Sequence, residues 1–131
     1  MSQQSIFMKI YEFSYPEPIL KNFCICYTNL MQIILLGSVE NFIASLNNQE
    51  IAKSLHVIEL LEEFGNRLGM PHSKHLDDSM FELRIRGKRE IRIFYCFHKN
   101  KVIMLHAFIK KTKTTPSKEL LKAKAAKKRF V

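Results

Sequence analysis

The chain has 131 residues, 47% of them hydrophobic, and a formal net charge of +9. This length allows one domain with its own core and is too short for two, and the hydrophobic content excludes a disordered tail. Residues 84–131 carry a charge of +14 and residues 1–83 a charge of −5. A strongly basic half predicts binding to nucleic acid or to an anionic surface.

The cysteines and the apolar stretches predict a reduced, cytoplasmic protein without a membrane segment. Cys24, Cys26 and Cys96 cannot all pair within the chain, and the spacing of the first two is not that of a zinc site. We interpret all three as ordinary thiols. Polar residues interrupt the apolar stretch 19–36, which is too short and too polar to span a bilayer.

Residues 1–30 have no pattern that continues into the rest of the chain. Residues 6–15 could form a short strand, and Tyr15-Pro16-Glu17-Pro18 ends any regular element. We therefore divide the chain into an N-terminal extension, 1–30, and a domain, 31–131. We expect the extension to be dispensable, with Met31 as a candidate translation start. The alternative is that the extension adds an edge strand or covers apolar surface.

A strand from Gln32 to Leu36 is predicted to precede two helices. Ser38 can cap the first helix, and Asn47-Asn48 ends it. The second helix begins near Gln49, and Gly65 ends it. Their apolar residues recur at helical spacing: Val39, Phe42, Ile43 and Leu46, then Ile51, Leu55, Ile58, Leu61 and Phe64. The two helices form a hairpin that must pack on a sheet.

Residues 66–78 are predicted to be a loop. It contains His72 and His75, three residues apart. A metal site would need two further ligands, and no matching acid or cysteine cluster accompanies the pair. No metal or other cofactor is therefore predicted. His56, which lies off the apolar stripe of the second helix, is predicted at the surface.

Residues 81–109 predict three strands joined by short polar turns, an antiparallel meander. Alternating residues of a strand share a face, so Arg84 and Arg86 are predicted together, with Arg92 on the next strand. Lys110, Lys111 and Lys113 follow the third strand. This surface is either an ordinary solvated face or a groove that binds a polyanion.

A last, basic helix is predicted from Lys118 to about Arg129. Pro116 suits a helix start, and Thr115 or Ser117 could cap it. Leu120 and Leu121 are its only large apolar anchors. A solvated terminal helix, a nucleic-acid contact and a frayed basic tail all remain open.

Three blocks of sequence occur in an order typical of one toxin family. They are LLEEFGNRLGMPHSKHL at 60–76, FELR and IRIFY at 81–84 and 91–95, and LHAFIKKTKTTP at 105–116. They resemble the "LLEEFG…LG-P--K-L", "ELR…YRVFY" and "LLHGFVKKTQKTP" segments of the phage-derived, HigB-like branch of the RelE toxin superfamily. The resemblance covers about residues 31–127.

The resemblance implies an α+β fold similar to microbial ribonucleases, an antiparallel sheet packed by the helical hairpin, with a basic C-terminal helix. It implies the toxin of a type II toxin–antitoxin system, an endoribonuclease that cuts mRNA in the ribosome. Its partners would be the ribosome, mRNA and a cognate antitoxin, helix-turn-helix and HigA-like. In RelE-like enzymes the RNA 2′-hydroxyl attacks the adjacent phosphate, so no metal is required.

Roles for individual residues follow from the same resemblance. Arg92 and Lys111, both expected at a polar surface, would stabilise the charge on phosphorus. The residues expected to bind or position RNA are Arg84, Arg86, Lys110 and Lys113. RelE has a catalytic tyrosine after its last basic residue, which 112–117 lacks, and Glu82 stands where RelE has a lysine. His98, His106 or a lysine of lowered pKa could transfer protons, or His106 could simply pack in its strand.

Two other functions fit the same fold. ParE-like relatives act on DNA gyrase, and an inactive relative would be an antitoxin-binding or RNA-binding module. The arginines and lysines gathered by the predicted sheet favour the nuclease, because a toxin that inhibits a protein does not need cations for phosphate. A basic protein on an anionic membrane would rest on the last helix alone.

Overall fold

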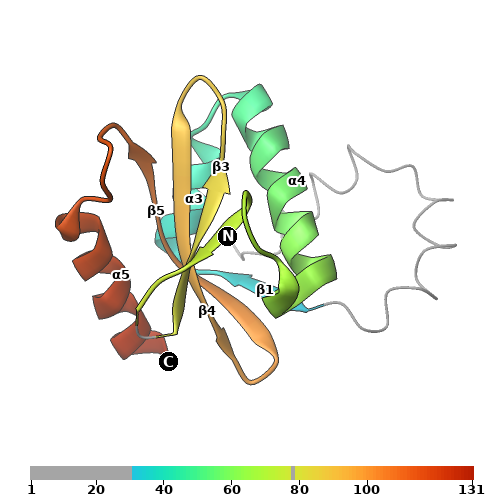
Figure 1. The fold of residues 1–131 in the computed structure, drawn as a ribbon, viewed down its shortest axis with the longest axis vertical. Helices are drawn as coiled ribbons and strands as arrows, with labels where there is room; N and C mark the ends of the chain where they lie inside the picture. Colours follow the sequence, from blue (N-terminus) through green and yellow to red (C-terminus); the bar gives the residue numbers. More distant parts are fainter. Residues whose placement is uncertain (1–30, 78) are drawn as a thin grey trace, which may run out of the picture.

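A single five-stranded sheet organises the protein, with two helices on one face and the C-terminal helix on the other (Figure 1). The computed structural model describes residues 31–77 and 79–131. The predictions made for residues 1–30, including Cys24 and Cys26, lie outside the described residues. The elements are β1 Gln32–Leu35, α3 Gly37–Ala44, α4 Asn48–Phe64, the 3-10 helix η1 Gly65–Arg67, β2 Ser73–His75, β3 Met80–Ile85, β4 Glu90–His98, β5 Lys101–Lys110 and α5 Ser117–Phe130.

The sheet is mixed, in the strand order β1-β5-β4-β3-β2. The pairs β2–β3, β3–β4 and β4–β5 are antiparallel, which confirms the predicted meander. The wholly antiparallel sheet is wrong, because β1 pairs parallel to β5, with Gln32 opposite Lys101. The chain leaves β1 through α3 and α4, which pack on one face, and re-enters the sheet at its far edge in β2.

Each face of the sheet has its own apolar core. Val39, Ile43, Ile58 and Leu61 of the helical hairpin are buried on one face, as the helical spacing predicts. Phe64, the last residue of α4, is 41% exposed, so its place in the apolar stripe is wrong. His56 is exposed, as predicted.

On the other face, which we call the α5 face, Leu120, Ala123 and Ala126 of α5 pack against β4 and β5. A frayed tail is therefore excluded. Leu121, one of the two predicted anchors, is 65% exposed, and the fully buried Ala123 takes its place. A small side chain at this position lets the helix approach the sheet closely.

Several helix ends differ from the predictions, because the residues expected to cap them do not do so. Neither α3 nor α5 has a side-chain cap, and Ser38 lies inside α3. Asn47 does not end the first helix but caps the second: its Oδ1 accepts from the Glu50 N–H at 2.8 Å, and Glu50 reaches back to the Asn47 N–H. This reciprocal capping box satisfies two otherwise unpaired donors.

The predicted loop 66–78 contains η1 and the short strand β2. Ser73 of β2 is buried, and its hydroxyl lies 2.5 Å from the hydroxyl of Tyr95 on β4. Three residues were too few for the alternation of side chains to predict a strand. Pairing with β3 and this buried hydrogen bond hold β2 in place.

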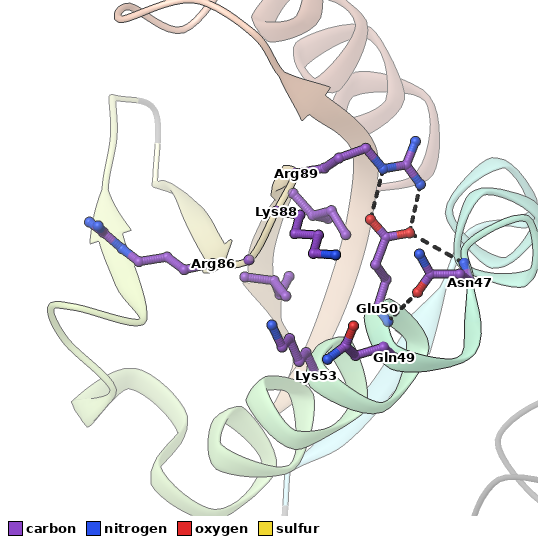
Figure 2. Close-up of a pocket in the computed structure, with 10 residues that line it drawn as sticks. Asn47, Gln49, Glu50, Lys53, Arg86, Lys88 and Arg89 are labelled. Carbon is purple, nitrogen blue, oxygen red and sulfur yellow. Dashed lines mark hydrogen bonds and ion pairs between the residues drawn. The ribbon is translucent and has the colours of Figure 1, made fainter.

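Glu50 ties the start of α4 to the turn between β3 and β4. Both of its carboxylate oxygens accept from Arg89, at 2.6 and 2.7 Å (Figure 2). The hydrogen bonds from Arg89 lower the pKa of Glu50. The pair closes one end of a small cavity of about 30 Å³ between helix and turn. Lys53 also lines it, with its Nζ near Gly87.

Replacing Arg89 with alanine should lower the melting temperature near neutral pH, modestly because Arg89 is half exposed. A lowered carboxylate pKa stabilises the fold above the ordinary value of 4.5, and this contribution is lost as the pH falls through the lowered value. Melting curves of Arg89→Ala and wild type should therefore converge in acid. Lys88→Ala, an exposed cation on the same turn, is the control and should show no such convergence. A pH-independent difference for Arg89→Ala would contradict the prediction.

Candidate active site

Charged side chains meet on the α5 face at the end where β3 finishes and β4 begins. Arg84 of β3 and Arg92 of β4 lie directly opposite each other in the sheet register. Like charges in this position destabilise an antiparallel pair. A countercharge is therefore required, and Glu82, two residues before Arg84 on the same face, supplies it.

The Glu82 carboxylate is the centre of this cluster and is 1% exposed. Its Oε1 accepts from Arg84 Nε at 3.1 Å and lies 3.5 Å from Arg92 Nε. Its Oε2 accepts from the hydroxyl of Thr115 at 3.0 Å. We call Glu82, Arg84, Arg92 and Thr115 the Glu82 cluster. It joins two strands to the loop that leads into α5.

Arg92 is buried, not at a polar surface as expected, with 5% of the residue exposed. Its Nη1 donates to Glu90 at 2.9 Å and to the carbonyl of Ile91 at 3.2 Å. Its Nε is the one buried side-chain polar atom without a hydrogen-bond partner among the described residues. Truncating Arg92 would leave Glu82 and Glu90 poorly compensated, so its loss should affect folding.

Arg84 is the more accessible guanidinium of the two, with 13% of its side chain exposed. It uses only Nε to reach Glu82. A guanidinium has five N–H donors, and the four on its terminal nitrogens bind no described residue. Glu82 therefore orients Arg84 without using the donors that could bind a phosphate in a bidentate way.

A β-bulge turns His106 toward this face. The register between β4 and β5 shifts between Phe94 and Tyr95: Phe94 faces His106, and Tyr95 faces Met104. Leu105 and His106 consequently both lie on the α5 face, whereas strict alternation would place His106 with Met104 against α4. The ring of His106 stacks on Phe108, with centroids 6.0 Å apart.

Glu119 in the first turn of α5 binds His106: its Oε2 contacts the imidazole Nε2. The two side chains are 17% and 19% exposed, so the pair is partly accessible to solvent. His106 is thus packed in its strand, and its ring is also held by a carboxylate. His98, the other proton-transfer candidate, lies at the far end of β4, about 20 Å along the strand from Arg92.

Lys110, the last residue of β5, and the lysines that follow it are not members of the Glu82 cluster. Lys110 faces Glu90 in the register and is half-buried. Lys111 and Lys113 are exposed, and neither forms an ion pair with any described residue. Arg86 lies beyond the last residue of β3, and its exposed side chain points away from the Glu50–Arg89 pair (Figure 2). The structure thus brings Arg84, Arg92 and His106 to one face and leaves Arg86 at its margin.

Sequence reasoning missed Thr115 and Glu119 as members of this site and gave Glu82 no role. For Thr115 the sequence predicts only a role as a helix cap. Glu119 is the one acid among residues 110–131, which contain nine lysines and arginines. A single carboxylate in so basic a segment indicates a specific ion-pair partner, and this signal could have predicted a role for Glu119.

Three further observations concern the residues that the structure describes. No group of three or more His, Cys, Asp or Glu side chains there could hold a metal ion. None of the described helices is both long and apolar enough to cross a membrane. Cys96 is free and buried, and burial raises the pKa of its thiol, which keeps the sulfur protonated and unreactive.

The comparison with protein families defines the class of this protein. Residues 41–128 match the family described as Phage derived protein Gp49-like (DUF891). The match spans α3 to α5 and therefore the whole Glu82 cluster, and the chain belongs to this family. No curated protein matches the chain. The family is phage-derived, toxin-like and associated with RelE-type proteins, and membership implies an antitoxin partner.

Removing the charge of Glu82 should destabilise the protein, because Arg84 and Arg92 would lose their shared counterion. Breaking a buried ion pair typically costs about 3 kcal/mol or more. Glu82→Gln keeps the size of the side chain and should lose about that much free energy of unfolding in urea denaturation. Glu90→Gln is the matched control on the same face. Its carboxylate is 39% exposed, so its loss should be smaller. Equal losses would show that Glu82 is not the central countercharge.

Proposed function

We propose that this protein is the toxin of a type II toxin–antitoxin system, of the HigB-like branch, and cuts ribosome-bound mRNA without a metal ion. The observation that carries the proposal is the placement of an oriented, partly exposed arginine and an imidazole on one face of the sheet. Family membership supports a toxin-like protein. The proposed cleavage reaction is inferred from the side chains of the site.

In the proposed reaction the 2′-hydroxyl of a nucleotide attacks the adjacent phosphorus. Negative charge then builds up on the phosphoryl oxygens, and nearby fixed cations stabilise it. Arg84 suits this role because Glu82 orients it and its terminal nitrogens are available. Lys111 adds an exposed charge. Arg92 is buried between Glu82 and Glu90, so we assign it to holding the cluster together instead of touching phosphate.

The cations outside the Glu82 cluster would position the substrate. Lys110, Lys113 and Arg86 would contact RNA phosphates, which position a strand without reading its sequence. Residues 31–131 would form the toxin domain, which would act in the cytoplasm on the ribosome. The inhibitor would be a helix-turn-helix, HigA-like antitoxin.

One feature of the site favours a non-catalytic alternative. Glu82 and Glu90 neutralise Arg84 and Arg92, so these four side chains together carry no net charge. A same-fold toxin that inhibits DNA gyrase, or an inactive RNA-binding or antitoxin-binding module, would tolerate arginines neutralised in this way. The two functions differ in what happens to mRNA in the cell.

Expressing the protein without an antitoxin should arrest growth and cut translated mRNAs inside their reading frames. Mapping RNA 5′ ends before and after induction would reveal new ends confined to translated regions. Blocking initiation on a reporter mRNA should protect that mRNA, because cleavage requires the ribosome. Growth arrest with intact mRNA and stalled DNA replication would instead support the gyrase alternative.

Arg84→Gln and Lys111→Ala should each lower the cleavage rate, by roughly 100-fold to 1,000-fold for a well-placed charge-stabilising group. Lys101→Ala is the control, because Lys101 is an exposed lysine at the opposite end of β5. Rates should be measured with purified protein, translating ribosomes and a defined mRNA, beside melting curves. Wild-type rates for both variants would refute these assignments. Inactivity of Arg92→Ala would be informative only if its melting temperature were unchanged.

A further inference from the structure

We propose that His106 and Glu119 form the proton-transfer pair of this site, with His106 as the general base and Glu119 as its positioning residue. This inference rests on the proposed ribonuclease function. It adds a group from α5, a helix that the sequence predicts as a solvated helix, a nucleic-acid contact or a frayed basic tail. Three observations carry it: the bulge, the contact and the exposure of the ring.

The bulge places the imidazole on the face of the sheet that carries Arg84 and Arg92. Arg92 faces Phe108 in the register, and His106 is the next residue of β5 on the same face. The stack of His106 on Phe108 fixes the plane of the ring. Bulges are common next to active sites because they redirect a side chain without moving the strands around it.

The contact with Glu119 selects one form of the ring. Glu119 touches Nε2, so the neutral imidazole carries its proton there and donates it to the carboxylate. The lone pair then lies on Nδ1, which makes no hydrogen bond with any described residue. A carboxylate held against one nitrogen also stabilises the positive charge that the ring acquires when the other nitrogen takes a proton.

The proposed step balances as follows. Nδ1 of His106 removes the proton from the 2′-hydroxyl as the O2′–P bond forms. The P–O5′ bond breaks, and the leaving 5′-oxygen takes a proton from water. The products are a 2′,3′-cyclic phosphate and a 5′-hydroxyl. His106 then returns its proton to solvent, which its partial exposure allows.

The pair also makes the docking of α5 part of the site. Thr115 binds Glu82 of β3 just before α5 begins, and Glu119 binds His106 of β5 in its first turn. Leu120 and Ala123 hold the same turns of the helix in the apolar core of this face. The start of α5 is therefore fixed on both sides of β4, which gives the carboxylate a defined position.

The test compares Glu119→Gln with Ser117→Ala, an exposed residue of the same helix turn, and with wild type in the ribosome assay. Glutamine keeps the shape and can still accept a hydrogen bond, but it has no negative charge with which to stabilise an imidazolium. We expect kcat to fall about tenfold or more for Glu119→Gln, with KM and melting temperature unchanged. His106→Ala should lose about 100-fold or more in rate, and added imidazole should restore part of it. A purely structural histidine would not be rescued in this way.

A second measurement does not depend on activity. Long-range 1H–15N spectra should show His106 protonated at Nε2 in wild type and as a mixture of tautomers in Glu119→Gln. If His106→Ala fails to fold, His106→Gln, which keeps a polar side chain at this position, replaces it and should be equally inactive. Wild-type kcat in Glu119→Gln or in a folded His106 variant would overturn the pair. Absence of cleavage by the wild type would refute the proposed nuclease, and the spectra would still test the role of Glu119.

Discussion

The charged face of this protein depends on one buried carboxylate. Glu82 lies between two arginines that the sheet register places directly opposite each other. Without it, the repulsion between Arg84 and Arg92 and the cost of burying Arg92 would oppose the pairing of β3 with β4. The same carboxylate accepts from Thr115, so it also fixes the end of the loop before α5. Strand pairing, helix docking and arginine orientation therefore share a single countercharge.

This arrangement changes what the basic composition means for function. The net charge of +9 suggests a broadly cationic surface, but the cations divide into two kinds. Arg84 and Arg92 are oriented and largely neutralised by acids, and Lys111 and Lys113 are exposed and make no ion pair with the described residues. Exposed lysines attract a polyanion over a distance that salt limits. An oriented guanidinium instead provides geometry at short range.

The sequence was sufficient to predict the elements formed by local patterns. The period of the apolar residues predicts the helical hairpin and the meander, and Gly65 marks the end of α4. The features that the sequence could not predict depend on contacts between residues that are distant in the chain. The parallel pairing of β1 with β5 joins Gln32 to Lys101, and no local pattern encodes it. The bulge in β5 reverses the side of His106, because one extra residue in the strand changes every later side chain to the other face.

The same reason explains why the candidate site was only half predicted. Arg84 and Arg92 belong to strands whose pairing follows from the meander, so their proximity could be inferred, whereas His106 joins them only through the bulge. Thr115 and Glu119 reach the sheet only because α5 folds back over β4 and β5, with Ala123 buried against it. The many lysines of α5 suggest a solvated helix, but its small side chains determine how it packs on the sheet. This packing brings Glu119, the one acid among residues 110–131, to His106. The carboxylate faces the sheet, where it can orient the imidazole ring.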